Sequence, residues 1–271
     1  MRLIENTARD ISLSIRLADS EADVRAAQAL RYQVFFRDMG AVPGGAVPGG
    51  AVPGGAAAGL DVDPYDRFCD HLLVEETGAD GARVVGTYRL LRQSVAARHG
   101  GFYSASEYDL VPLETHAARH GGELLELGRS CVAPEYRDTA TIQLLWRGIG
   151  DYLMQRRIGH MFGCASFPGT DPDAHAAALA YLHHNHLAPQ DRRVSAHARH
   201  FTDMARLPIG GYDPKAAWRA LPPLIKGYLR VGAMVGSGAF IDRQFNTVDV
   251  FMMMPVDAIA ARYAKRFGAA A

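Results

Sequence analysis

Apolar residues along the 271-residue chain recur with two different periods. After a capping box at Ser20, Val24, Ala27, Leu30 and Val34 follow helical spacing and predict a helix that stops at Gly40. The same period predicts helices over 138–157, 171–187 and 256–266, and a short helix within 94–120. Apolar runs predict strands at 12–17, 71–76, 83–91, 124–132, 160–167 and 247–254. Strands and helices that alternate in this way, with local hairpins, predict a mixed α/β fold.

The regular pattern is interrupted by three tandem copies of AVPGG, at residues 41–55, followed by AAAG. Repeated Pro-Gly steps favour turns and flexible chain over a packed core. We therefore expect a flexible insertion at 41–59 within a single domain that spans 1–271. Residues 206–271 begin with a Pro- and Gly-rich stretch, and we expect them to form a C-terminal extension packed on the core.

Composition narrows the class of protein. Lys plus Arg and Asp plus Glu are balanced at 29 each, which gives no argument for nucleic-acid binding. The three cysteines have no paired spacing, so we expect reduced thiols and a cytoplasmic location. No apolar run approaches the length of a membrane span, so any contact with the inner membrane is expected to be peripheral.

Several segments share a resemblance that covers nearly the whole chain from about residue 25 to 265, apart from the AVPGG insert. They include LRYQVFFRDMG, DVDPYDRFCDHLLV, VVGTYRLLR, LELGRSCVAPEYRDTATIQLLWRGI, GCASFPG, LPPLIKGYLRVGA and FNTVDVFMMMPV. Together they resemble the ornithine–acyl-[acyl carrier protein] N-acyltransferases, once called hemolysin-like. That family is similar to the GCN5-related N-acyltransferase superfamily and, more distantly, to acyl-homoserine lactone synthases. The resemblance implies a mixed central sheet flanked by helices.

The resemblance also implies a reaction. A 3-hydroxyacyl chain passes from acyl carrier protein to the α-amine of L-ornithine, which starts ornithine-lipid synthesis. The donor carries its own phosphopantetheine, so no separate cofactor is expected. Two alternatives stay open: another N-acyl product, such as an acyl-homoserine lactone or a different acyl amino acid, and a non-catalytic lipid-associated protein. The histidines at 183–186 lack a third ligand, so no metal site is expected.

Glu126 and Arg129 are the expected catalytic residues. They lie three apart on a predicted strand, where alternation would put them on opposite faces unless a bulge intervenes, and Gly128 suits a bulge. Glu126 is the candidate general base or ammonium ligand, with Arg129 orienting it. The alternative is a Glu126–Arg129 ion pair that only braces the sheet.

Charged residues elsewhere are candidates for binding the amino acid. Asp63 and Asp66 stand just before a predicted strand and suit a cationic substrate, although Asp-Pro also favours ordinary turns. Arg89, inside an apolar strand, and Arg31, on the first helix, could bind the substrate carboxylate bidentately or pair with the acids. For Arg31, a bracing or solvated role is the favoured interpretation.

The carrier is expected to bind where the central strand meets the next helix. Arg137, Thr139, Ala140 and Thr141 occupy the superfamily's carrier-binding position, without its usual glycines. Free N–H groups at this helix start could bind a phosphate, or the segment could be a plain helix cap. A backbone N–H near Cys131 or Val132 would polarise the thioester carbonyl.

Overall fold

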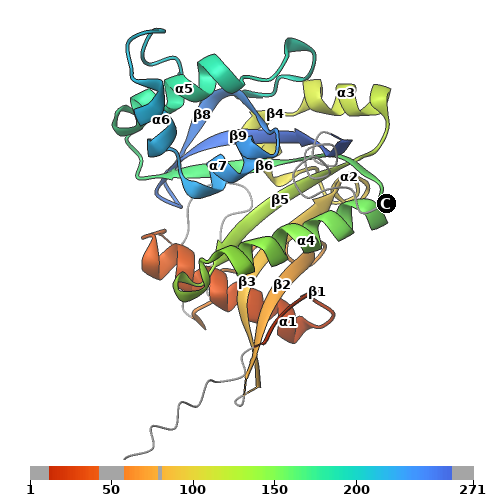
Figure 1. The fold of residues 1–271 in the computed structure, drawn as a ribbon. Helices are drawn as coiled ribbons and strands as arrows, with labels where there is room; N and C mark the ends of the chain where they lie inside the picture. The colour runs from red at the N-terminus through yellow and green to blue at the C-terminus, as the bar shows by residue number, and fades with distance from the viewer. Residues whose placement is uncertain (1–11, 43–57, 79–80, 258–271) are drawn as a thin grey trace, which may run out of the picture.

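The computed structural model describes residues 12–42, 58–78 and 81–257. Within these ranges, nine strands form one sheet in the order β1-β2-β3-β5-β6-β9-β8-β7-β4 (Figure 1). The strands are β1 (Ser12–Leu17), β2 (Asp70–Gly78), β3 (Gly81–Arg92), β4 (Tyr108–Asp109), β5 (Glu123–Val132), β6 (Ile158–Pro168), β7 (Ser195–Ala196), β8 (Met234–Asp242) and β9 (Thr247–Pro255). The parallel pair β5–β6 lies between antiparallel neighbours on both sides. The mixed α/β sheet expected from the sequence is therefore confirmed.

Capping residues and glycines set the ends of several of the seven α-helices in the described residues. They are α1 (Glu21–Arg31), α2 (Gln93–Ala96), α3 (Val111–His120), α4 (Thr139–Gln155), α5 (Ala176–His186), α6 (Pro214–Ala220) and α7 (Pro223–Arg230). The Ser20 hydroxyl accepts a hydrogen bond from the Asp23 N–H, which caps α1 as predicted. The helical path continues as a wider π-helical segment, η1 (Tyr32–Asp38), and stops before Gly40, whose φ of 77° suits glycine. The helix predicted at 171–187 divides into η5 (Pro172–His175) and α5.

Two apolar cores cover the two faces of the sheet. Alternate strand residues point to opposite faces, so Leu125 joins the core beneath α4 and α7, whereas Leu124 joins the core beneath α2 and α3. The same alternation holds for Met161 and Phe162 on β6. Both faces are covered, which explains the nearly continuous apolar runs of the central strands.

The C-terminal third differs most from its sequence prediction. Strand β9 lies between β6 and β8, so this segment is built into the sheet rather than packed on it as an extension. Helices α6 and α7 and strand β8 were not predicted, because their short apolar runs are broken by Pro and Gly. The AVPGG copies lie largely outside the described residues, as does most of the helix predicted at 256–266.

Strands β5 and β6 separate part-way along their length. Their parallel pairing runs from Glu123 opposite Ile158 to Glu126 opposite Phe162, after which β5 follows β3 and β6 follows β9. Gly163 lies at the point of separation, where an added Cβ would overlap the Leu127 carbonyl oxygen. Only glycine allows the two backbones to come this close before they diverge.

Replacing Gly163 with alanine is expected to destabilise the protein by about 1–3 kcal/mol, the usual range for overpacking a tight site. Urea denaturation measures the change in the free energy of unfolding. Gly150→Ala, on α4 where nothing lies within 4 Å of the new Cβ, is the matched control and should be neutral or stabilising. Equal stability of both variants would show that the separation of β5 and β6 does not depend on Gly163.

Candidate active site

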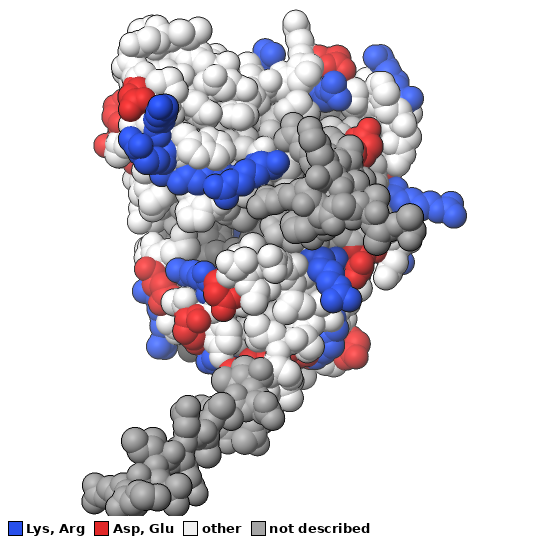
Figure 2. All heavy atoms as spheres, viewed as in Figure 1, with Lys and Arg blue, Asp and Glu red and all other residues white. Residues whose placement is uncertain are grey.

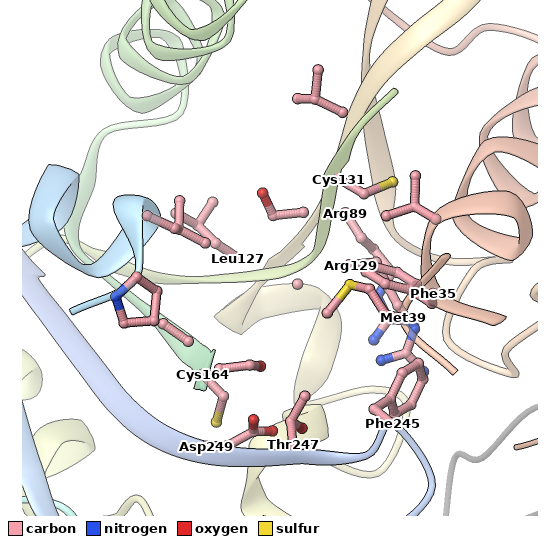
Figure 3. Close-up of a pocket in the computed structure, with 18 of the residues that line it drawn as sticks. Phe35, Met39, Arg89, Leu127, Arg129, Cys131, Cys164, Phe245, Thr247 and Asp249 are labelled. Atoms are coloured by element: carbon pink, nitrogen blue, oxygen red, sulfur yellow. The ribbon is translucent and has the colours of Figure 1, made fainter. Parts of the chain in front are cut away.

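A cavity of about 610 Å³ opens where β5 and β6 diverge (Figure 3). One wall comes from β5 and the end of β3, and the other from β6, β9 and the end of β8. Apolar side chains line part of it, namely Val34, Phe35, Trp146, Leu224 and Phe245. Charged side chains, among them Arg89, Glu107, Glu126 and Arg129, line another part, which we call the chamber. One cavity therefore combines room for an acyl chain with a charged region.

The predicted bulge in β5 is present. The pairing of β3 with β5 shifts between Thr87 and Arg89, opposite the segment from Gly128 to Cys131. Arg129 adopts a φ of 50°, a left-handed conformation that few non-glycine residues adopt. Because the bulge breaks the alternation, Glu126 and Arg129 both line the cavity.

Arg129 nevertheless has partners other than Glu126. Its Nη2 lies 2.7 Å from Asp63 Oδ2 and its Nε lies 3.2 Å from Asp61 Oδ2. Its guanidinium also lies between the rings of Tyr103 and Phe245, 5.0 and 4.6 Å from their centroids. The expectation that Arg129 orients Glu126 is therefore wrong, and so is the alternative of a Glu126–Arg129 brace.

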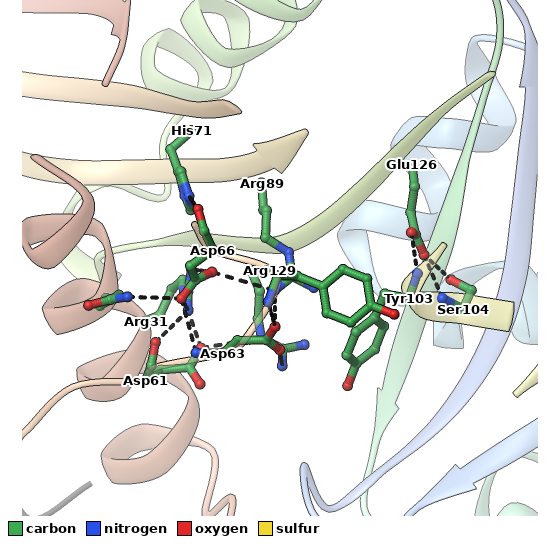
Figure 4. A network of polar contacts seen from close by, with 12 residues as sticks. Arg31, Asp61, Asp63, Asp66, His71, Arg89, Tyr103, Ser104, Glu126 and Arg129 are labelled. Carbon is green, nitrogen blue, oxygen red and sulfur yellow. Dashed lines mark hydrogen bonds and ion pairs between the residues drawn. The ribbon is translucent and has the colours of Figure 1, made fainter. Parts of the chain in front are cut away.

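Arg129 belongs to a buried network of three arginines and three aspartates (Figure 4). Arg31 pairs with Asp61 and Asp66, each at 2.8 Å, and Arg89 pairs with Asp63 at 2.9 Å and Asp66 at 3.5 Å. The Arg31 guanidinium lowers the pKa of the Asp66 carboxyl although burial opposes this. With three charges of each sign, the network is neutral overall.

Of the four residues predicted to bind the substrate, only one reaches the cavity. Arg89 lines the cavity, but Arg31, Asp63 and Asp66 lie behind its wall. Arg31 is fully buried and engaged by aspartates, so its predicted contact with substrate is wrong and its bracing role is the correct interpretation. Asp61, which joins Arg31 to Arg129, was not singled out in the sequence, since nothing distinguishes it from other loop acids.

Glu126 is held by the segment that follows α2. Its Oε2 accepts from the Tyr103 N–H at 2.8 Å, and its Oε1 accepts from the N–H of Ser104 at 2.8 Å and from the Ser104 hydroxyl. Burial raises the pKa of Glu126, and these donors offset only part of that rise. A carboxylate offers about four lone-pair positions, so one remains for a further donor.

At the start of α4, Asp138 is the N-cap and its Oδ1 accepts from the Thr141 N–H at 2.8 Å. This bond lowers the pKa of Asp138 and occupies the N–H that was expected to bind phosphate. For Thr141 the plain helix cap is therefore correct. Thr139 and Ala140 are exposed beside it, and their contact with a carrier stays a prediction.

The backbone at the end of β5 is open toward the cavity. Ala133 N–H donates to Val85 O on β3, so the preceding N–H, that of Val132, points away from β3 and toward the gap between β5 and β6. The Val132 carbonyl, on the same side, accepts from Arg137 Nε at 3.1 Å. Of the two predicted donors, geometry favours Val132 over Cys131.

Three further acids in the cavity were missed by sequence reasoning. Glu107, Asp242 and Asp249 are buried and line the same cavity as Glu126. The salt bridges between described residues leave these four carboxylates without a cationic partner. One signal was available in the sequence. Asp249 interrupts the apolar run TVDVFMMM, and an acid in a buried strand is costly unless it has a partner or a function.

Comparison with known proteins agrees with this architecture. The sequence model of the Acetyltransferase (GNAT) domain matches residues 30–147. An L-ornithine N(alpha)-acyltransferase of Rhizobium meliloti (strain 1021) is 47% identical over 265 residues, which are 96% of this chain and 86% of the relative. A protein of the same name from Rhodobacter capsulatus is 44% identical, over 94% of this chain and 95% of its own length. The chain belongs to the L-ornithine N(alpha)-acyltransferase family.

This family member is an acyltransferase with the fold of other N-acyltransferases. The solved structure of FeeM, an N-acyl amino acid synthase from uncultured soil microbes, superposes with a TM-score of 0.51 at 9% identity. It covers 93% of this chain and 95% of FeeM, so the likeness extends over the whole fold. Among the helices of the described residues, none is both long and apolar enough to cross a membrane.

Proposed function

We propose that the protein transfers a 3-hydroxyacyl chain from the thioester of acyl carrier protein to the α-amine of L-ornithine, which yields lyso-ornithine lipid. The observation that carries the proposal is the charge of the chamber. Four buried carboxylates lie there without a cationic partner among the described residues, while the arginines beside them are already neutralised by aspartates. Ornithine at neutral pH has two ammonium groups and one carboxylate, so it brings the missing positive charge. The names of the relatives support the same acceptor.

The residues suit direct transfer without a covalent enzyme intermediate. Glu126 takes a proton from the α-ammonium, directly or through water, and the free amine attacks the thioester carbon. The Val132 N–H lies where it can donate to the carbonyl oxygen as negative charge develops there. The new C–N bond forms, the C–S bond breaks, and the carrier thiolate leaves and takes up a proton.

Arg89 and Arg129 form the end of the chamber that presents guanidinium groups. They line the cavity next to Glu126, although their charge is shared with Asp63 and Asp61. The substrate carboxylate therefore meets a donor-rich wall rather than an excess of positive charge. Such an arrangement fixes orientation more than it adds affinity.

A carrier protein as donor is supported by the surface beside the cavity. Figure 2 shows a row of basic side chains across the upper part of one face, over the region where Figure 1 places α6 and α7. These helices contain Lys215, Arg219, Lys226 and Arg230. The segment from Pro222 to Leu224, at the start of α7, lines the cavity. Acyl carrier proteins are acidic, so a basic face at the mouth suits their docking.

The test is an acylation assay with purified protein and a panel of amines. Both 3-hydroxyacyl carrier protein and the corresponding acyl-CoA are offered as donors, and mass spectrometry identifies the products. We expect N-acylornithine from the carrier thioester. Acylation of a different amine in preference to ornithine would contradict the proposed acceptor, and equal use of acyl-CoA would contradict the proposed carrier.

A further inference from the structure

One face of the sheet gathers polar side chains from three neighbouring strands. Thr247 and Asp249 are two apart on β9 and so share a face. Ser166 of β6 lies opposite Asp249, and Asp242 of β8 lies opposite Thr247. All four line the cavity, and Figure 3 shows Thr247 and Asp249 projecting into it from β9.

Asp249 is the group on this wall whose hydrogen bonding is incomplete. Only 7% of the residue is exposed, and its Oδ1 has no hydrogen bond of ordinary geometry among the described residues. The hydroxyls of Ser166 and Thr247 lie beside the Asp249 carboxyl and oppose the rise that burial causes in its pKa. The Thr247 hydroxyl also has no hydrogen bond of ordinary geometry among the described residues. The Tyr108 hydroxyl donates to the Asp249 main-chain carbonyl at 3.0 Å, which fixes the strand at this point. A buried acceptor without a donor is costly, so a ligand that supplies one is favoured.

Glu107 stands beside this wall. Its Oε2 lies 3.6 Å from Cys164 Sγ, and Cys164 in turn lies 3.9 Å from the hydroxyl of Ser104, which binds Glu126. Burial raises the pKa of Glu107 well above its usual range, and the neighbouring Asp249 and Asp242 add to the rise. Burial likewise raises the pKa of Asp249 to about 6. The two acids therefore share an environment that lacks positive charge.

We infer that Asp249, with Thr247 and Glu107, binds the side-chain ammonium of the acceptor and so selects diamino acids. This inference rests on the proposed function. An ammonium has three N–H donors, and the three side chains offer an acceptor for each. Glu126 is left for the α-amine, because its position is fixed by three protein donors on the other side of Cys164.

The division of labour can be tested by changing enzyme and acceptor together. Norvaline has the carbon skeleton of ornithine without the side-chain amine. Asp249→Asn is expected to lower kcat/KM for ornithine by about 10- to 100-fold, the usual effect of losing a charge-assisted contact. For norvaline the same variant should equal the wild type or exceed it, so the preference for ornithine collapses.

Two further variants act as controls. Glu107→Gln should reduce the ornithine preference in the same direction, which guards against a folding defect peculiar to position 249. Asp151→Asn removes an acid from the exposed side of α4 and should leave both acceptors unaffected. Thermal unfolding confirms that each variant is folded at the assay temperature.

The pH dependence gives an independent readout. Because an ammonium favours the ionised acid, kcat/KM for ornithine should rise as pH increases through about 6, the pKa of Asp249. Charged and titratable groups that face this site are Glu107, Asp242, Cys164, Glu126, Arg129, Tyr103 and Tyr108. The base Glu126 affects both acceptors, so the ratio of the ornithine and norvaline profiles isolates the second site.

The outcomes separate the inference from the function on which it rests. If the wild type does not acylate ornithine, the proposed function fails. If the wild type does so and Asp249→Asn lowers kcat/KM for ornithine and norvaline equally, Asp249 serves the shared chemistry and the inference fails. An unchanged ornithine preference in both Asp249→Asn and Glu107→Gln would also overturn it.

Discussion

Replacing Glu126 with glutamine is expected to lower kcat by about 10²- to 10⁴-fold, the range for loss of a general base. The glutamine keeps the size of the side chain and can still accept from Ser104 through its oxygen. It cannot take a proton from the ammonium, so the rise of kcat with pH that reflects ionisation of Glu126 should disappear. Because the pKa of Glu126 is raised by burial, that rise lies above the usual range of a glutamate. Steady-state rates over a pH series measure both effects.

The control for this variant lies on the same strand. Glu123 is outside the cavity and accepts from the Ser94 N–H at 2.7 Å, so Glu123→Gln removes an acid from β5 without touching the chamber. Its kcat should remain near that of the wild type. A Glu126→Gln enzyme that keeps its pH profile and loses only affinity would show that Glu126 positions the Tyr103–Ser104 segment and does not accept the proton.

Replacing Arg31 with methionine is expected to lower the free energy of unfolding by about 3–5 kcal/mol. The residue is fully buried, and its loss leaves Asp61 and Asp66 with unbalanced negative charge in the interior. Urea denaturation followed by circular dichroism measures the change. Arg25→Met, on the exposed side of the same helix, should stay within about 0.5 kcal/mol of the wild type.

A loss of stability in Arg31→Met no larger than in Arg25→Met would show that the acids are stabilised by other means. Activity offers a second readout, because Asp61 also contacts Arg129 at the cavity wall. We expect the folded fraction of Arg31→Met to turn over more slowly than the wild type, with the defect in KM for the amino acid. A normal KM would show that the arginine–aspartate network does not contribute to binding of the amino acid in the chamber.

The sequence predicted those parts of the fold that depend on local pattern. The Ser20 cap, the amphipathic α4 and the strands around Leu125 and Met161 follow directly from spacing and capping. Strand β8 and helices α6 and α7 did not, because runs such as MVGSGAFID owe their conformation to pairing with β9 rather than to their own composition. Their position is a tertiary effect.

The residues of the site also fall into those that local sequence pattern could predict and those that depend on tertiary contacts. Glu126 could be found because an acid in an apolar strand is conspicuous, and the bulge at Arg129 could be inferred from the alternation it has to break. The partner of Arg129 could not, since Asp61 and Asp63 reach it from a loop about 66 residues earlier in the chain. Glu107 lies in a polar segment where any acid looks solvated, and only the fold shows that it is 3% exposed.

The separation of β5 from β6 also divides the work of the cavity between two halves of the sheet. The half with β3 and β5 carries the neutral arginine–aspartate network and the backbone that meets the thioester, and its side chains are tied to the stability of the fold. The half with β6, β9 and β8 carries the carboxylates of Asp242 and Asp249, which take part in no salt bridge between described residues. Natural variation or directed evolution can therefore remodel the choice of acceptor through Asp249 and its neighbours while the scaffold and the acyl-transfer machinery stay intact.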